Sequence, residues 1–110
     1  MEIDEAIAAL ASLAQPTRLE AFRLLVRHEP EGLPAGELAR RLAVPPNTLS
    51  AHLNILSHAG LTTAARKGRS VVYRASVGRL GQLTTFLAQD CCGGGDCAIQ
   101  TTTKCMEASA

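Results

Sequence analysis

The chain has 110 residues and a net charge of +1, and 46% of its residues are hydrophobic and 19% charged, which favours one compact domain over two domains or a disordered chain. With no Trp, one Tyr and two Phe, its modest core must be built from Leu, Ala, Ile and Val, so that burying further surface in a dimer would add stability. No stretch approaches the roughly 20 apolar residues of a membrane span and the acidic start is unlike a signal peptide, so we expect a cytoplasmic protein with no membrane partner.

Two helices are predicted in the first thirty residues. The first carries apolar residues at helical spacing, namely Ile3, Ala6, Ile7, Leu10 and Leu13. Gln15-Pro16 interrupts it, and because Pro suits a first helical position, a second helix is expected from Pro16 to about His28. Its apolar stripe is Leu19, Phe22, Leu25 and Val26.

The next two predicted helices form a helix-turn-helix. Pro34 opens a short third helix that turns Arg40 and Arg41 to solvent, and a fourth runs from Pro45-Pro46 to Gly60, which is placed to end it. At about 100° per residue, the fourth helix has one leucine face and one opposite face of small or polar residues. The leucine face is Leu49, Leu53 and Leu56, and the opposite face is Asn47, Ala51, Asn54 and His58. Small polar side chains let a helix approach base edges in the major groove of DNA.

A basic hairpin is predicted after this helix. Residues 61–65 and 70–75 form its strands and Arg66-Lys67-Gly68-Arg69 its turn, and it should pack on the helices as a wing. Between Arg40 and Arg79 there are seven Arg or Lys and no Asp or Glu. This strip suits DNA phosphates, the alternative being a merely solvated face.

A fifth helix is expected from Val77 to Asp90, with the apolar stripe Val77, Leu80, Leu83, Thr84 and Leu87. The stripes of the first and fifth helices exceed what a small core covers, so both are assigned to a homodimer interface, the alternative being that they complete the monomer core. The predicted fold is mainly α with a small β-hairpin, a winged helix-turn-helix of five helices. Residues 1–90 form the DNA-binding and dimerisation domain, and residues 91–110 a flexible tail.

Three motifs resemble the ArsR/SmtB family of metal- and metalloid-responsive repressors. They are residues 13–19 (Leu-Ala-Gln-Pro-Thr-Arg-Leu), residues 48–56 with Ala59-Gly60-Leu61, and the wing at residues 67–74. The resemblance implies a homodimer whose fourth helices read an inverted repeat in double-stranded operator DNA. It places the contacts at Pro46, Asn47, Thr48, Ser50, Ala51, His52, Asn54, Arg66, Lys67 and Arg69, with Ser50 and His52 on the family's Ser-x-His-Leu signature.

The chain also departs from its relatives in this family. Residues 51, 54 and 57 are often basic in relatives but are Ala, Asn and Ser here, so affinity should depend more on the wing. The third helix lacks the Cys-Val-Cys of well-known arsenic sensors, and the fifth offers no His for a zinc site.

Cysteines in the tail are the predicted inducer site. Four thiols in a reducing compartment favour ligands or reactive groups over disulfides. Trivalent arsenic binds three thiolates in a pyramid, and thiolates suit such a soft ion. Cys91 and Cys92 supply two, and the glycines at 93–95 let Cys97 complete the set. Arsenic sensors with a Cys-Cys pair just after the fifth helix and another Cys a few residues on form a subset of this family. The resemblance therefore implies arsenite or antimonite as the inducer and release from DNA as the response. Cys105 is left open as a further ligand.

Other readings of the cysteines remain. Zinc or cadmium could use all four cysteines, although adjacent cysteines strain a structural site. The cluster could instead respond to oxidation. In a third alternative the tail has no function, and the protein is a constitutive DNA-binding scaffold. An enzyme, such as a thiol-dependent reductase, has no support because no glycine loop between a strand and a helix is present to bind an anion.

Overall fold

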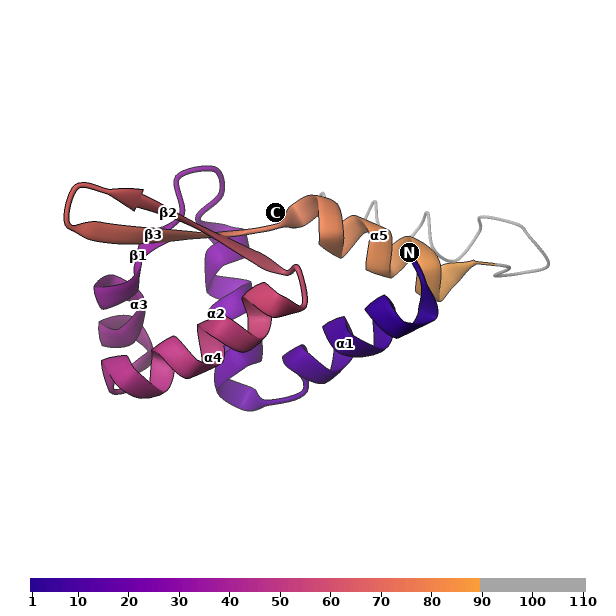
Figure 1. Cartoon of the computed structure of the whole chain (residues 1–110), viewed down its shortest axis with the longest axis horizontal. Coiled ribbons are helices and arrows are strands. Elements are labelled where there is room, and N and C mark those ends of the chain that lie inside the picture. Colours follow the sequence, from indigo (N-terminus) through magenta and orange to yellow (C-terminus); the bar gives the residue numbers. More distant parts are fainter. Residues whose placement is uncertain (90–110) are drawn as a thin grey trace.

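The computed structural model describes residues 1–89. Its elements are α1 (Ile3–Leu13), α2 (Pro16–Arg27), β1 (Leu33–Pro34), α3 (Ala35–Leu42), α4 (Pro46–His58), β2 (Thr62–Lys67), β3 (Ser70–Ala75) and α5 (Val77–Ala88). Helices α2, α3 and α4 lie under one side of the hairpin, and α1 and α5 lie together at the other end of the molecule (Figure 1). The predicted winged helix-turn-helix is confirmed. Within residues 1–89, no helix is long and apolar enough to cross a membrane.

Local capping explains where the predicted helices begin and end. The side chain of Gln15 accepts a hydrogen bond from the backbone N–H of Arg18 at 2.8 Å, and Pro16 occupies the first turn of α2, as its fixed φ favours. At the end of α4, the N–H of Gly60 donates to Ser57 O and that of Leu61 donates to Leu56 O, at 2.9 and 3.0 Å. This is a Schellman motif, and Gly60 supplies the left-handed residue with φ 81°.

The end of α3 has the same hydrogen-bond pattern with a less suitable residue. The N–H of Val44 donates to Ala39 O and that of Ala43 to Arg40 O, while Ala43 has φ 55°. A Cβ disfavours this left-handed conformation. We therefore predict that Ala43→Gly raises the free energy of unfolding by about 1 kcal/mol, measured by urea denaturation. Ala51→Gly, inside α4, is the control and should lower it by about the same amount.

The sheet has one strand more than predicted. The two-residue β1 pairs antiparallel with β3, Leu33 opposite Tyr73 and Pro34 opposite Val72, giving the strand order β1-β3-β2. The expectation that Pro34 opens α3 was wrong by one position, because Pro34 is extended and caps a helix that begins at Ala35. A proline fits here because an edge strand tolerates a missing N–H. A strand of two residues shows no alternation from which it could be predicted.

The hairpin turn is tighter than predicted. Strand β2 continues to Lys67, which pairs with Ser70, so only Gly68 and Arg69 form the loop, with Gly68 at φ 62°. Two-residue hairpin loops need such a positive φ. Arg66 therefore lies within the strand, opposite Val71, and not in the turn as predicted from the sequence.

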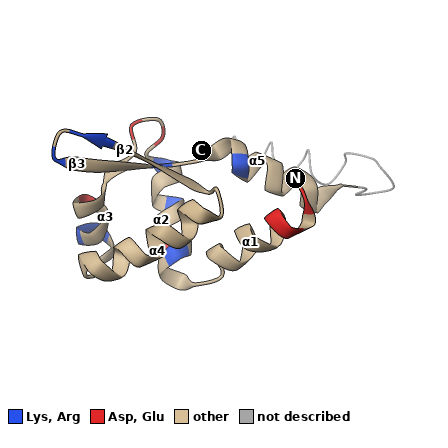
Figure 2. Cartoon of the chain, viewed as in Figure 1, with Lys and Arg blue, Asp and Glu red and all other residues tan. Residues whose placement is uncertain are grey.

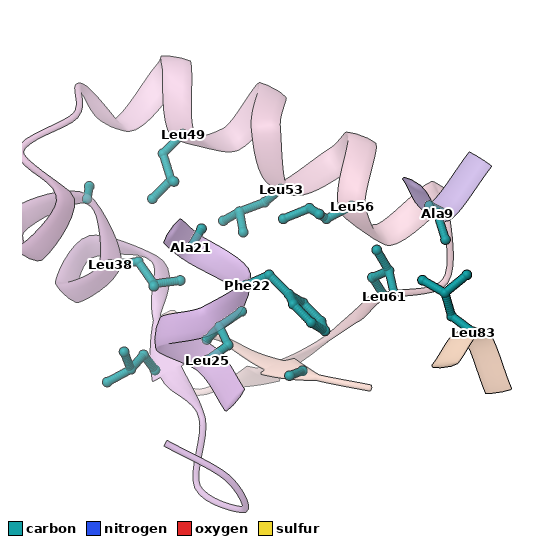
Figure 3. Packing of buried hydrophobic residues seen from close by; sticks show 14 of the residues in the cluster. Ala9, Ala21, Phe22, Leu25, Leu38, Leu49, Leu53, Leu56, Leu61 and Leu83 are labelled. Carbon is teal, nitrogen blue, oxygen red and sulfur yellow. The ribbon is translucent and has the colours of Figure 1, made fainter. Parts of the chain in front are cut away.

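The core fixes the orientation of α4. Its predicted leucine face is buried, and the three leucines point toward α2 and its Phe22 (Figure 3). The fully buried large side chains are Leu25, Leu38, Leu49, Leu53, Leu56 and Leu61. Since α4 cannot rotate without exposing this face, its opposite face is held toward solvent.

The apolar stripe of α1 is divided between the core and the surface. Ala6, Ala9 and Ser12 are buried, whereas Ile3, Ile7 and Leu10 are 64%, 57% and 42% exposed. On α5, Leu83 is buried but Val77 and Leu87 are 50% and 57% exposed. Within the described chain, the core of one copy therefore leaves much of both stripes uncovered.

Candidate nucleic-acid interface

The outward face of α4 carries most of the predicted base contacts. The exposed members of the predicted set are Pro46, Asn47, Thr48, Ser50, Ala51 and Asn54. None has a long or charged side chain, so the helix backbone can approach a groove floor closely, and the amides and hydroxyls can both donate and accept hydrogen bonds there.

His52, also predicted to contact DNA, is placed differently. It is half-buried, and its Nδ1 lies 3.3 Å from Nη1 of Arg18, whose Nε donates to the carbonyl of Ser12 at 2.6 Å. A guanidinium has no acceptor atom, so a hydrogen bond between these two groups requires Nδ1 of His52 to accept. His52 thus ties α4 to the junction between α1 and α2.

The predicted basic strip is divided by carboxylates. Glu37 contacts both Arg40 and Arg41. Nη2 of Arg79 lies 3.6 Å from Oε2 of Glu5. Arg74 donates two hydrogen bonds of 3.0 Å to the carboxylate of Glu29. All of these glutamates precede residue 40, so the charge pattern of residues 40–79 does not include them.

The wing tip differs from the rest of the strip. Arg66, Lys67 and Arg69 are exposed, and within residues 1–89 none of them forms an ion pair with a carboxylate. Figure 2 shows this basic hairpin end far from the acidic first turn of α1. The wing tip is therefore the part of the strip whose charge is most available to DNA phosphates.

The Arg74–Glu29 pair ties β3 to the loop after α2 and gives a pH-dependent prediction. Hydrogen bonds from Arg74 lower the pKa of Glu29 below its ordinary 4.5. Because this pKa is lower in the folded state than in the unfolded state, the ion pair stabilises the fold at pH values above the pKa of the unfolded state. The stabilisation is lost as the pH falls through the pKa of the folded state.

We therefore predict that Glu29→Gln is less stable than the wild type at neutral pH, and that the gap closes as pH falls below about 4.5. Urea denaturation from pH 7 to pH 3 measures this. Glu20→Gln, an exposed carboxylate on α2, is the control and should show no comparable gap. A Glu29→Gln gap that is constant with pH would contradict the ion-pair explanation.

The predicted inducer ligands lie outside the described residues. These are Cys91, Cys92, Cys97 and the additional candidate Cys105. In the part of the chain that the structure describes, no three His, Cys, Asp or Glu side chains lie close enough together to hold a metal ion.

Comparisons with known proteins agree with this architecture. A family model described as a helix-turn-helix domain matches residues 13–63. The HTH-type transcriptional repressor SmtB of Mycobacterium tuberculosis, in two strains, is 40% identical over 72 residues, which are 66% of this chain and 51% of the relative. The chain thus spans about half the length of the curated relatives it matches.

Solved structures extend the similarity over most of the described chain. An ArsR-like transcriptional regulator from Rhodococcus sp. RHA1 is 32% identical with a TM-score of 0.70, over 77% of each chain. A possible transcriptional regulator for arsenical resistance is 32% identical with a TM-score of 0.63, over 72% of this chain and 79% of that one.

A third structure is the homodimeric winged helix-turn-helix DNA-binding domain of a possible ArsR-family regulator from Mycobacterium bovis. It is 27% identical with a TM-score of 0.65, over 80% of this chain and 82% of that one. These relatives are named as transcriptional regulators or as a repressor, and not as enzymes. With the fold and the exposed α4 face, the identity to the Rhodococcus regulator shows that the chain belongs to the ArsR/SmtB family of winged helix-turn-helix transcriptional regulators.

Proposed function

We propose that this protein is a homodimeric repressor that binds an inverted repeat in operator DNA and is released when trivalent arsenic binds Cys91, Cys92 and Cys97. In this proposal α4 enters the major groove and the wing contacts the backbone or the adjacent minor groove. Residues 1–90 are the DNA-binding and dimerisation unit, and residues 91–110 carry the inducer site.

The observation that carries the DNA-binding proposal is the contrast between two surfaces. The outward face of α4 is exposed, small and polar, while the wing tip carries three exposed cations without a carboxylate partner in residues 1–89. The first surface suits base edges and the second suits phosphates. Their combination supports a groove-binding helix with an electrostatic anchor.

Exposed apolar residues support the homodimer. Ile3, Ile7 and Leu10 follow one another at helical spacing along α1 and are 42–64% exposed, a stripe that a second copy of α1 and α5 would cover. The homodimeric relative from Mycobacterium bovis supports the same assembly.

We predict that Ile7→Asp makes the protein monomeric and weakens its DNA binding by roughly a hundredfold, because two linked helices bind far more tightly than one. Sedimentation velocity and fluorescence anisotropy measure the two effects. Leu19→Asp on α2 places the same charge at a position 43% exposed outside the proposed interface, and should stay dimeric. A dimeric Ile7→Asp protein would contradict the interface.

Sensing is proposed from the chemistry of the cysteines. Three thiolates match the ligand number of trivalent arsenic, and one similar structure is described as a possible regulator for arsenical resistance. The fourth cysteine, Cys105, favours zinc or cadmium as the second candidate because these ions take four ligands. In either case, we propose that binding of the ion beyond α5 shifts that helix and the relative orientation of the two α4 helices.

The test uses reduced protein bound to a labelled duplex from the region upstream of its own gene. Arsenite should lower the affinity for this duplex by roughly 5- to 150-fold, the range of typical allosteric coupling. Antimonite, zinc, cadmium and a thiol oxidant are added in parallel. Release by zinc or cadmium alone would favour the second candidate, and release by none of them would disprove sensing while leaving DNA binding in place.

A further inference from the structure

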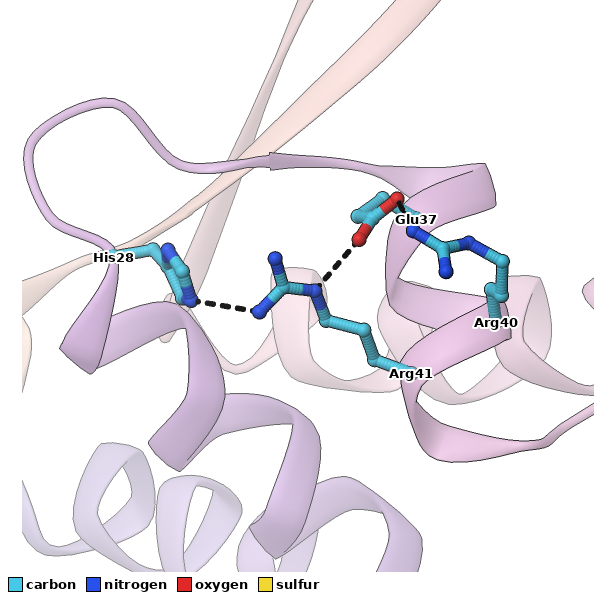
Figure 4. Close-up of polar contacts among 4 residues, drawn as sticks. All are labelled: His28, Glu37, Arg40 and Arg41. Atoms are coloured by element: carbon cyan, nitrogen blue, oxygen red, sulfur yellow. Dashed lines mark hydrogen bonds and ion pairs between the residues drawn. The ribbon is translucent and has the colours of Figure 1, made fainter.

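Glu37 holds two arginines on the outer side of α3 (Figure 4). One carboxylate oxygen contacts Arg40, and the other accepts a hydrogen bond from Nε of Arg41 at 2.7 Å. These two arginines lower the pKa of Glu37, so the carboxylate stays charged at neutral pH. It therefore neutralises part of the positive charge beside the helix-turn-helix.

The two arginines are not equivalent. Arg41 is also held from the side of α2, where its Nη1 lies 3.2 Å from Nε2 of His28, and its side chain is 41% exposed. Arg40 has Glu37 as its one ion-pair partner in residues 1–89, and its side chain is 73% exposed. Arg41 thus braces α3 against the end of α2, whereas Arg40 can turn away at little cost.

Arg40 also lies close to the start of α4. It lines a hollow of about 430 Å³ at the turn of the helix-turn-helix, together with Ala43 and with Pro46, the first residue of α4. In Figure 2 the basic residues of α3 and those of the hairpin lie at the same end of the molecule. A duplex whose groove receives the start of α4 would bring its backbone within reach of this arginine.

We propose that Arg40 binds a DNA phosphate and that Glu37 competes with that phosphate for its guanidinium, so that Glu37 limits DNA affinity without regard to sequence. This inference rests on the proposed DNA-binding function and extends it to a regulating carboxylate. The exchange is feasible because an exposed ion pair is weak, while a phosphate accepts the same charge-assisted hydrogen bonds.

The test compares variants on two labelled duplexes of equal length, one from upstream of the gene and one of mixed sequence. At about 150 mM salt, where distant charges are screened, Glu37→Gln should tighten binding to both roughly three- to tenfold. Arg40→Gln should weaken binding to both duplexes. It should also reduce the slope of log affinity against log salt by about 2, because each of the two protomers loses one phosphate contact and each contact contributes about 0.9 to the slope. Arg41→Gln should leave this slope unchanged and lower the midpoint of urea unfolding.

Two controls separate this mechanism from general electrostatics. Asp4→Asn removes one charge from the first turn of α1, at the far end of the molecule (Figure 2), and should not change affinity. In the Arg40→Gln background, Glu37→Gln should no longer tighten binding.

The outcomes distinguish this inference from the proposed function. Suppose that the wild type binds its upstream duplex but Glu37→Gln does not tighten this binding; the inference is then wrong and the proposed function stands. The same holds if Glu37→Gln tightens binding equally in the wild-type and in the Arg40→Gln background. Tightening on the upstream duplex alone would mean base reading and would also overturn it. If the wild type binds neither duplex, the proposed function fails and takes this inference with it.

Discussion

Replacing Arg66, Lys67 and Arg69 together by Gln should weaken DNA binding by about a hundredfold or more near 100 mM salt. A dimer would lose six cations that are exposed and have no carboxylate partner within residues 1–89. If all six meet phosphates, the slope of log affinity against log salt falls by about 5, at 0.9 per phosphate. The loss should be similar on upstream and mixed-sequence duplexes, because phosphate contacts carry no sequence information.

The fold should survive this triple substitution because all three side chains project from the hairpin end and are exposed. Arg23→Gln with Arg27→Gln, two exposed cations of α2, is the control for net charge. If this control costs as much affinity per charge as the wing variant, general electrostatics explain the binding and the wing has no special role. Equal unfolding midpoints for wild type and wing variant confirm that affinity, not stability, has changed.

The sequence allowed prediction of those elements whose ends depend on local chemistry. Gln15-Pro16 and Gly60 mark helix boundaries because capping and a left-handed φ are properties of single residues. The strand β1 was missed because its two residues are extended only through pairing with β3, some forty positions later. The partners of the arginines were missed for the same reason, since Glu5 and Glu29 meet Arg79 and Arg74 only after folding.

The candidate site was predictable to a similar degree. Helical periodicity correctly separated the buried leucines of α4 from its outward face. The same rule puts His52 only about 60° from Leu49 around the helix, on the inner side, where the structure has it contacting Arg18. The resemblance also assigns His52 to the DNA contacts, and that assignment stays a prediction; the half-buried position of His52 is the part that the periodicity indicated.

Replacing Cys91, Cys92 and Cys97 together by Ser should abolish the effect of arsenite on DNA binding, whereas the wild-type affinity should fall by roughly 5- to 150-fold. Serine keeps the size of the side chain but removes the soft thiolate that trivalent arsenic requires. Without arsenite, the variant should bind DNA as the wild type does, because α4 and the wing are unchanged. A variant that is still released by arsenite would disprove this inducer site.

Cys105→Ser is the matched control, because it removes one thiol from the same segment while leaving the three proposed ligands in place. It should retain the full arsenite response. Loss of the response would make Cys105 one of the arsenite ligands and would contradict the proposed set of Cys91, Cys92 and Cys97. Coupling is reciprocal, so the upstream duplex must weaken arsenite binding to the wild type by the same factor by which arsenite weakens DNA binding. Titrating arsenite with and without the duplex measures that factor independently, and unequal factors would mean that arsenite acts through modified or aggregated protein, not through a conformational equilibrium.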